Sequence, residues 1–356
     1  MVSSNGAGRA FIGSFTSAGG RGVTAVAVDQ DTGALTVLGA TDAVPDPSYL
    51  ALGRGSGPGG AVLYAVSETE PGAAAAFDLT HDVPRPIGAT RPVDGDSPTH
   101  LALAGGRLLT ANYGSGSVTV LPVREDGSLG AADSVLRHEG SGPDTGRQEG
   151  PHAHQVLPDP SGNWVLSVDL GTDSVRICAL GPDTGELHPH GETVLRPGTG
   201  PRHLAFHPDG AHAYVLNELE PTVTVCRWDA VAGVLETVGE TSVLPAEATG
   251  EGAAASYASE VVVSHDGRFL WVANRGHDSI SVLGLDATGE KASLVTTVSC
   301  GGHWPRDLAL DPAGRRLYAA NERSGNVAWF AVDPETGIPA QEGSLEAPAA
   351  SCVIFA

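Results

Sequence analysis

The chain is nearly devoid of lysine. Lys291 is its only one, so arginine supplies almost all of the 20 basic residues, against 42 acidic residues and a formal net charge of −22. Such an excess of negative charge argues against nucleic acid or an anionic membrane surface as a partner. A small anionic ligand is possible only where arginines gather locally against that background.

Long apolar segments are missing as well. No run of about 18 apolar residues occurs, and the first residues, Met1 to Gly6, contain no basic segment followed by an apolar one. We therefore expect no membrane span, no export signal and a cytoplasmic location.

Cysteine is scarce, and no two of the four cysteines are spaced as zinc ligands or as a redox pair. Cys178 and Cys226 hold the same place in successive repeats, so we expect buried packing positions there and no disulfide. His152 and His154 could put two metal ligands on one side of a strand, but no third ligand of fitting type is close in the sequence. Residues 142–146 resemble no phosphate loop. We therefore predict neither a metal nor another cofactor.

What the chain does contain is a unit of about fifty residues that recurs along nearly all of it. The unit is clearest where Pro98 to Leu101, Pro201 to Leu204 and Pro305 to Leu308 begin a strand. A short turn with glycine, a second strand and an asparagine follow, and the 48 Gly and 25 Pro suit many such turns. Short strands repeating at this period are typical of a β-propeller, in which each repeat forms one blade.

The number of blades follows from the residues that begin each first strand. Six of them lie 47 to 57 residues apart: Pro47, Pro98, Ala153, Pro201, Ala258 and Pro305. A seventh blade is divided between the ends of the chain. Ala350 to Phe355 resembles a first strand with nothing after it, and Arg9 to Phe15 resembles a second strand with nothing before it.

We therefore predict an all-β fold with a single domain over residues 1–356. It is a seven-bladed β-propeller of four-stranded antiparallel blades, and the N- and C-terminal strands close the ring by sharing one blade. Such closure removes exposed sheet edges, and we expect a monomer.

Two segments are longer than the repeat requires, residues 138–150 and 246–256. Each precedes a first strand, on the face where we expect the site. Insertions in repeat proteins often decorate the binding face, but they are also tolerated as surface loops without a role, and the sequence leaves both open.

Polar and charged residues recur at two positions of the repeat. Directly after the first residue of each inner strand come Ser48, Thr99, His154, Arg202, Ser259 and Arg306. At or near the end of each second strand come Glu68, Tyr113, Leu170, Glu218, Arg275 and Glu322. These two points lie at the same face of an antiparallel blade, and in the last four of these blades they are always sixteen residues apart. We therefore expect the side chains on one rim of the central channel.

This set of residue types suits acid–base chemistry on an anionic substrate. His154 and Glu218 can each take up and return a proton near neutral pH. Arginine presents a planar fork to carboxylate or phosphate and can stabilise an oxyanion. The candidates for substrate binding are Arg147, Arg202, Arg275 and Arg306. The alternative is a ring of ion pairs that locks neighbouring blades. The chain has no Gly-x-Ser-x-Gly sequence, so covalent acyl catalysis is not expected.

Taken together, these residues resemble the seven-bladed propeller lactonases, which include a bacterial 6-phosphogluconolactonase type and fungal carboxy-cis,cis-muconate cyclases. The resemblance spans almost the whole chain and is carried by Pro47 to Leu50, Leu63 to Glu68, Ala111 to Tyr113, Arg147 to His154, Gly200 to His203, Leu216 to Leu219, Ala258 to Glu260 and Asn274 to Ile280. It implies a site built from one His, two Arg and one Glu, which here are His154, Arg202, Arg275 and Glu218.

Three hypotheses about function follow. The resemblance implies a lactonase of carbohydrate metabolism that hydrolyses an anionic sugar lactone, foremost 6-phosphogluconolactone of the pentose phosphate pathway, with His154 or Glu218 activating water. The same groups could instead cyclise an unsaturated dicarboxylate to a lactone, as a carboxymuconate-type cycloisomerase. A non-catalytic propeller scaffold would show an exposed apolar patch, and rim arginines and glutamates that pair off with no cavity between them.

Overall fold

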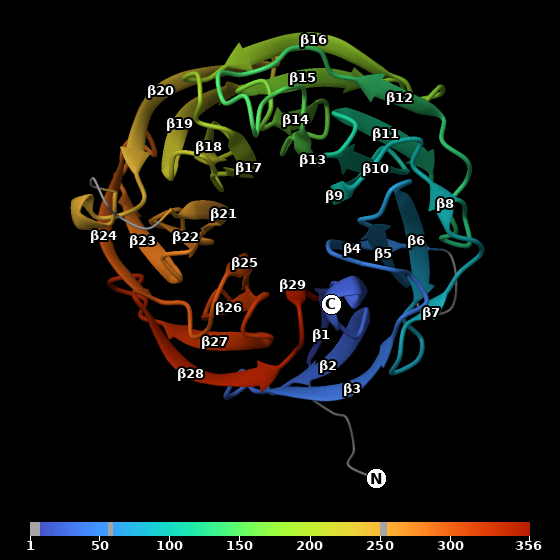
Figure 1. Cartoon of the computed structure of the whole chain (residues 1–356), viewed down its shortest axis with the longest axis horizontal. Helices are drawn as coiled ribbons and strands as arrows, with labels where there is room; N and C mark the ends of the chain where they lie inside the picture. Colours follow the sequence, from blue (N-terminus) through green and yellow to red (C-terminus); the bar gives the residue numbers. More distant parts are fainter. Residues whose placement is uncertain (1–7, 56–59, 250–254) are drawn as a thin grey trace.

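The computed structural model describes residues 8–55, 60–249 and 255–356. Over these residues the strands form seven antiparallel sheets that stand around a common axis like the blades of a propeller (Figure 1). The predicted fold class is therefore confirmed. Met1 to Gly6, the segment that bears on an export signal, lies outside the described residues.

Each blade runs outward from a strand at the axis. The blade shared by the two ends contains β29 (Ala350–Phe355), β1 (Gly8–Ser14), β2 (Val23–Val28) and β3 (Leu35–Thr41). The second contains β4 (Leu50–Arg54), β5 (Ala61–Ser67), β6 (Ala73–Asp78), β7 (Arg85–Pro86) and β8 (Arg91–Pro92). The third contains β9 (Pro98–Ala104), β10 (Arg107–Asn112), β11 (Ser117–Pro122) and β12 (Ser134–Arg137).

The fourth blade contains β13 (Ala153–Pro158), β14 (Val165–Asp169), β15 (Ser174–Leu180) and β16 (Leu187–Val194). The fifth contains β17 (Pro201–Phe206), β18 (His212–Asn217), β19 (Thr222–Asp229) and β20 (Val234–Ser242). The sixth contains β21 (Tyr257–Val263), β22 (Phe269–Arg275), β23 (Ser279–Leu285) and β24 (Ala292–Ser299). The seventh contains β25 (Pro305–Leu310), β26 (Arg316–Asn321), β27 (Asn326–Val332) and β28 (Pro339–Glu346). The described residues also contain two short 3-10 helices, η1 (Thr16–Ala18) after β1 and η2 (Ala246–Ala248) after β20.

The two ends of the chain close the ring as predicted. Strand β29 pairs antiparallel with β1, so that Ala10 lies opposite Phe355 and Ile12 opposite Val353. This pairing gives the N-terminal strands the inner strand that they lack in the sequence, and it covers an edge that would otherwise be open to other chains.

The apolar core lies between neighbouring blades. One cluster joins Ile12 of the first blade to Tyr318 of the seventh. The hydroxyl of Tyr318 also donates to the carbonyl of Gly33 across that boundary, at 2.8 Å. Two tyrosines on other second strands make the same bond to the following blade, Tyr64 to Gly127 (3.0 Å) and Tyr214 to Gly289 (2.9 Å). Second strands are therefore covered on both sides, as in β14, which is buried at every residue, whereas in the outermost strand β3 burial alternates along the strand.

The second blade departs from the four-stranded pattern. Its outer edge is split into β7 and β8, and both short pieces pair with β6. Pro86 and Pro92 stand in these two pieces and have no N–H to donate to a ladder, which keeps each piece short.

In six blades the inner strand contains a β-bulge near its start. The pairing with the second strand shifts by one residue there, so that one extra residue bulges from the inner strand. The extra residues are Thr99, His154, Arg202, Ser259, Arg306 and Ser351. A bulge re-aims the side chain that it carries. All but Ser351 belong to the set that the repeat predicts at the rim.

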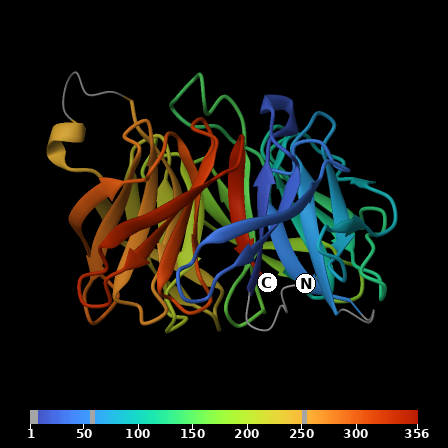
Figure 2. The same cartoon turned by 90° about the horizontal axis from the view of Figure 1, so that it is seen from below.

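The longer loops rise on one face of the ring. Figure 2 shows the green segment that follows β12, and η2 at the start of the second loop, above the same edge as η1. Residues 250–254 of the predicted loop 246–256 lie outside the described residues.

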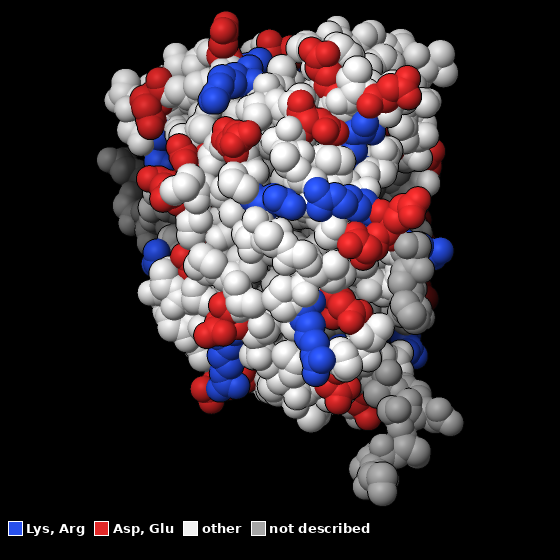
Figure 3. All heavy atoms as spheres, turned by 90° about the vertical axis from the view of Figure 1, so that its right-hand side faces the viewer, with Lys and Arg blue, Asp and Glu red and all other residues white. Residues whose placement is uncertain are grey.

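The cysteines lie where the sequence predicts them. All four cysteines are buried and free, which confirms the prediction for Cys178 and Cys226. In the part of the chain that the structure describes, no helix has the length and apolar character to cross a membrane. Acidic and basic side chains lie beside one another on the outer wall (Figure 3).

Candidate active site

The centre of the site is Glu218, which follows β18 and is almost fully buried. Three arginines from different parts of the chain meet it: Arg147 Nη2 at 2.7 Å, Arg275 Nη2 at 2.8 Å and Arg202 Nε at 3.2 Å. Burial alone would raise the pKa of Glu218, but the three guanidinium groups lower it to about 2. The carboxylate is therefore ionised at neutral pH and its oxygens are engaged by cations.

The three arginines reach Glu218 from separate elements. Arg202 bulges from β17, and Arg275 ends β22. Arg147 lies in the longer loop 138–150, so this loop contributes to the site directly. Burial and the neighbouring Arg275 lower the pKa of Arg202 to about 10, which still leaves it charged at neutral pH. Its guanidinium also donates to the carbonyl of Ser259.

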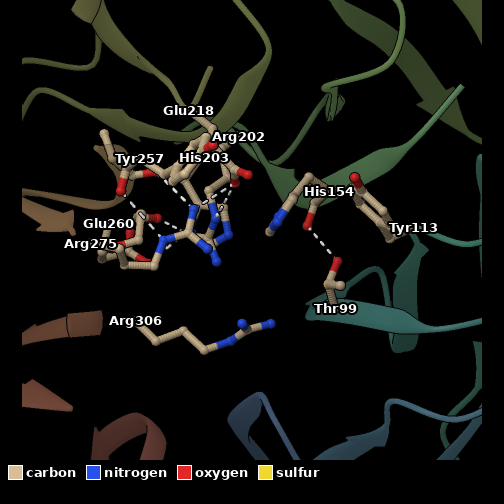
Figure 4. A network of polar contacts seen from close by, with 12 residues as sticks. Thr99, Tyr113, His154, Arg202, His203, Glu218, Tyr257, Glu260, Arg275 and Arg306 are labelled. Atoms are coloured by element: carbon tan, nitrogen blue, oxygen red, sulfur yellow. Dashed lines mark hydrogen bonds and ion pairs between the residues drawn. The ribbon is translucent and has the colours of Figure 1, made fainter. Parts of the chain in front are cut away.

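His154 bulges from β13 and is buried. Burial and the nearby charge of Arg202 hold its pKa well below the ordinary range, so the imidazole is neutral at neutral pH. Its Nδ1 is buried without a hydrogen-bond partner among the described residues. Figure 4 shows the ring directed toward a space bordered by Arg202 and Arg306. A neutral imidazole here can accept a proton.

Arg306 forms a second group beside the first. It lies between two carboxylates from different blades, with Nη1 3.2 Å from Glu322 and Nη2 3.4 Å from Glu68. Its guanidinium stands over the ring of Phe15, 4.8 Å from the centroid. The charge of Glu218 also stabilises the protonated form of Arg306, which places the two groups within electrostatic reach of one another.

Two other arginines of the site, Arg147 and Arg275, also lie beside aromatic rings. Arg147 stands 6.0 Å from the ring centroid of Tyr257, and Arg275 stands 5.7 Å from that of Trp304. Such rings attract the cation through their negative faces and restrict its motion. The site therefore combines fixed positive charges with apolar surfaces at its mouth.

The structure thus brings all six residues selected from the sequence to one region. Arg147, Arg202 and Arg275 contact Glu218, while His154 and Arg306 border the same space (Figure 4). None of these contacts assigns a catalytic role, so the roles remain predictions.

Sequence reasoning missed a group of residues directly behind this set. His100, His203, Glu260 and Asp307 are buried in the inner strands, one residue after the rim positions. His203 Nδ1 lies 2.7 Å from Glu260 Oε2. The signal was present, because polar residues recur at this offset in strands that are otherwise apolar, a pattern that calls for partners.

A metal could be held elsewhere. Among the described residues, one group of three side chains has the required closeness, His207, Asp209 and His212, in the turn between β17 and β18. This turn lies at the opposite end of β17 from Arg202. His152, considered as a ligand with His154, instead bonds the carbonyl of Tyr113 at 2.9 Å. The absence of a metal or cofactor from the site stays a prediction.

Comparison with known proteins identifies the family. Residues 9–355 match the model described as lactonase, 7-bladed beta-propeller. The chain is 35% identical over 350 residues, 97% of both chains, to the 6-phosphogluconolactonase of Bacillus subtilis (strain 168).

The chain belongs to the seven-bladed β-propeller lactonase family. Solved structures of similar chains support the same assignment. A putative 6-phosphogluconolactonase of Bacteroides fragilis is 28% identical with a TM-score of 0.88, covering 100% of this chain and 99% of its own. The periplasmic gluconolactonase of Pseudomonas aeruginosa is 29% identical with a TM-score of 0.88, covering 98% and 99%. This lactonase-family chain thus shares its whole architecture with proteins named for two different lactones.

Proposed function

We propose that the protein hydrolyses an anionic sugar lactone, foremost 6-phosphogluconolactone to 6-phosphogluconate. The family and the B. subtilis relative supply the class of reaction. The observation that carries the proposal is the neutral, buried His154 beside a cluster of charged arginines in a chain with a net charge of −22. A base and an anion-binding surface therefore face the same space.

His154 is the general base in this proposal. Glu218 is the weaker candidate, because three guanidinium groups occupy its oxygens and lower its pKa to about 2, whereas His154 Nδ1 has no hydrogen-bond partner among the described residues. Glu218 instead keeps Arg147, Arg202 and Arg275 in place. In the proposed reaction, His154 therefore takes the proton from water.

The proposed hydrolysis of the lactone begins with attack by water. His154 takes a proton from water while the water oxygen forms a bond to the lactone carbonyl carbon. Arg202 and Arg275 stabilise the negative oxygen of the tetrahedral intermediate. The bond from the carbonyl carbon to the ring oxygen breaks, and His154 returns its proton to that oxygen. Arg147 and Arg306 bind the phosphate, and the carboxylic acid product loses its proton to solvent.

The scaffold hypothesis is supported by one observation. The rim arginines and glutamates do pair, Glu218 with three arginines and Arg306 with Glu68 and Glu322. If this ring of ion pairs had a purely structural role, however, each of its buried polar atoms should have a hydrogen-bond partner. His154 Nδ1 and Glu68 Oε2 are buried without a partner in the described ranges, which is typical of groups that meet a ligand or water. Large exposed apolar side chains of the described surface, such as Leu38, Val194 and Val295, are spread over separate blades.

Acid release from purified lactones tests the proposal. We expect the wild type to hydrolyse 6-phosphogluconolactone, and His154→Gln and Arg275→Ala each to lower kcat/KM by about 100-fold or more. Glu218→Gln should lower it as well, because the arginines lose their common partner. Assays with unphosphorylated sugar lactones and with muconate acids, followed by the ultraviolet absorbance of the diene, separate hydrolysis from cyclisation.

Arg227→Ala is the matched control. This arginine also forms ion pairs with a glutamate, Glu290 at 2.6 Å, but on the exposed outer part of the molecule. Its removal should leave kcat/KM unchanged. Hydrolysis at wild-type rates by both His154→Gln and Arg275→Ala would refute the proposed site.

A further inference from the structure

The second half of the loop 138–150 is anchored by a buried amide. Gln148 is fully buried, and its Nε2 donates to two acceptors of the fourth blade, the Leu170 carbonyl and Asp173 Oδ1, each at 2.8 Å. Both acceptors lie in the turn between β14 and β15. Breaking such bonds would leave polar groups unpaired in the interior, which is costly, so the contacts hold the loop on the fourth blade.

The other polar groups of Gln148 bond within the loop itself. Its Oε1 accepts the N–H of Asp144 at 3.2 Å, and its own N–H donates to the Asp144 carbonyl at 2.7 Å. Its carbonyl accepts the N–H of Gly142 at 3.0 Å. A methyl group at Gly142 would lie only 2.4 Å from the Gln148 side chain. The loop therefore closes tightly around this one residue.

Asp173 joins the loop to the segment that leads into β17. Its Oδ1 accepts the Gly200 N–H at 2.8 Å in addition to the Gln148 amide, and its Oδ2 accepts the Gly198 N–H at 2.7 Å. The Gly200 carbonyl in turn accepts the Glu218 N–H at 2.7 Å. One buried carboxylate thus connects the loop with the backbone beside Glu218.

Arg147 directly precedes this anchor in the sequence. Its own N–H lies 3.2 Å from both the carbonyl oxygen and Oδ1 of Asp144, so its backbone is held on both sides. Its Nη2 contacts Glu218 at 2.7 Å and the Tyr113 hydroxyl at 3.5 Å. The side chain nevertheless remains 37% exposed. Arg147 is therefore fixed in place and still accessible to a ligand.

We propose that Gln148 and Asp173 are positioning residues that hold Arg147 at the rim, where it favours a phosphorylated sugar lactone over the unphosphorylated one. An arginine on a free surface loop would lose backbone and side-chain freedom on binding a phosphate. Here the contacts of Gln148 and Asp173 fix the backbone before the substrate arrives, so less freedom is lost. The preference for phosphate rests on the proposed function, whereas the fixed position of Arg147 does not.

Amide hydrogen exchange, followed by mass spectrometry of loop peptides, tests the anchor without any substrate. We expect the amides of residues 142–148 to exchange slowly in the wild type and about tenfold faster in Gln148→Ala, while those of β14 stay as slow as in the wild type. Equal exchange of the loop in both proteins would overturn the proposal. Faster exchange throughout β14 would also overturn it, because Gln148 would then stabilise the whole fold.

Gln341→Ala is the matched control for this measurement. Gln341 is an exposed glutamine of the outermost strand β28, so its removal takes away the same side chain without a buried partner. The loop should exchange in this variant as it does in the wild type. A loop that exchanges faster in Gln341→Ala as well would contradict the role assigned to Gln148.

Kinetics test the consequence for substrate selection. We expect Gln148→Ala to lower the ratio of kcat/KM for 6-phosphogluconolactone to kcat/KM for the unphosphorylated lactone by about tenfold, through a higher KM for the phosphorylated substrate. In a chain that already carries Arg147→Ala, the same change should alter this ratio by no more than about twofold, because Gln148 acts through Arg147. A full effect in that background would contradict the positioning role. A wild type that hydrolyses neither lactone but shows the expected exchange would refute the proposed function alone.

Discussion

Glu218 owes its charge entirely to its neighbours. A buried carboxyl group would ordinarily be neutral, yet three guanidinium groups within 3.2 Å keep this one ionised. In return, the carboxylate compensates Arg202, which is just as buried. Removing one partner of such a group leaves an uncompensated charge in the interior and costs more than the pair contributes.

The first prediction concerns the pH dependence of this group. The pKa of Glu218 is lower in the folded protein than in the unfolded chain, so its ionised form stabilises the fold above pH ~4.3 and that contribution disappears as the pH falls through about 2. We expect Glu218→Gln to lower the free energy of unfolding by about 3 kcal/mol at neutral pH and by roughly half as much near pH 3. Urea unfolding at the two pH values measures the difference.

The control for this prediction is Glu236→Gln, since Glu236 pairs with Arg227 at 3.7 Å on the exposed outer strands. This variant should unfold like the wild type at both pH values because exposed pairs contribute little. A loss for Glu218→Gln that is equally large near pH 3 and at neutral pH would contradict the assigned cause.

Trp304 shows backbone strain at the site. The residue directly before an inner strand takes a left-handed conformation in four blades, and these residues are Ser97, Gly200, Trp304 and Ala349. Three of them are small, whereas a tryptophan at φ 64° costs about 1–2 kcal/mol. Its ring lies 3.3 Å from the guanidinium of Arg323 and 5.7 Å from that of Arg275. Stacking beside the rim arginines offsets that cost.

At the scale of elements, the bulge decides which residues face the axis. In a regular strand, successive side chains point to opposite sides, so Arg202 and His203 could not both line the channel. The extra residue in β17 turns Arg202 to Glu218 while His203 still meets Glu260. Equal offsets in the sequence predicted the first of these positions. They did not predict the second, because strict alternation assigns it to the other side.

The second prediction concerns close packing of β1 against its neighbours. A methyl group at Gly13 would overlap the Pro47 carbonyl oxygen and lie 2.7 Å from Cys352 Sγ. Gly13→Ala should therefore lower the free energy of unfolding by about 1–3 kcal/mol, because the blades cannot separate locally. Denaturant titration measures it.

Gly239→Ala provides the control for that variant. Gly239 lies in the outer strand β20 and a methyl group there meets no atom within 4 Å among the described residues. Its effect should stay within about 0.5 kcal/mol. Equal stabilities of the two variants would show that β1 packs less closely against its neighbours at Gly13 than the structure indicates.

At the scale of the whole molecule, the ring gathers charges that the composition conceals. The chain carries 22 more acidic than basic residues, and its outer wall mixes both signs (Figure 3). Around the axis, however, Arg147, Arg202, Arg275 and Arg306 come from four separate parts of the chain. These four arginines lie beside Glu218, Glu68 and Glu322, so basic residues are concentrated at the axis of an acidic protein. Such a concentration would favour the anionic substrate that we propose.

The third prediction concerns closure of the ring. A chain that ends at Ala349 lacks β29, the inner strand that pairs with β1. We expect this truncated chain to lose cooperative unfolding and to aggregate, because the exposed edge of β1 can pair with another chain. Circular dichroism during heating, together with light scattering, would reveal both effects. Addition of a peptide of residues 350–356 should restore part of the transition, and a truncated chain with the wild-type midpoint would contradict the role of β29.

The fourth prediction is a monomer in the cytoplasm. Pairing of β29 with β1 leaves the first blade without an open inner edge, so we expect no second copy to be needed there. Light scattering on a sizing column should give a mass near 36.1 kDa. Twice that mass would show that a surface away from the sheet edges is used. Cell fractionation tests the location. The alternative is the periplasm, where the similar gluconolactonase of P. aeruginosa is found.

The repeat alone determined the blade count, the shared terminal blade and the face on which Arg202, Arg275 and Glu218 stand, because an equal offset in equivalent units means an equal place around an axis. Only the tertiary structure decided that Arg147 reaches Glu218 from a loop, that Arg306 pairs with Glu68 across 238 residues of sequence, and that His203 and Glu260 join behind His154. Those contacts depend on distances between blades and on single-residue bulges. The length of the repeat determines neither the distances between blades nor the positions of the bulges, because both arise only when neighbouring blades pack together.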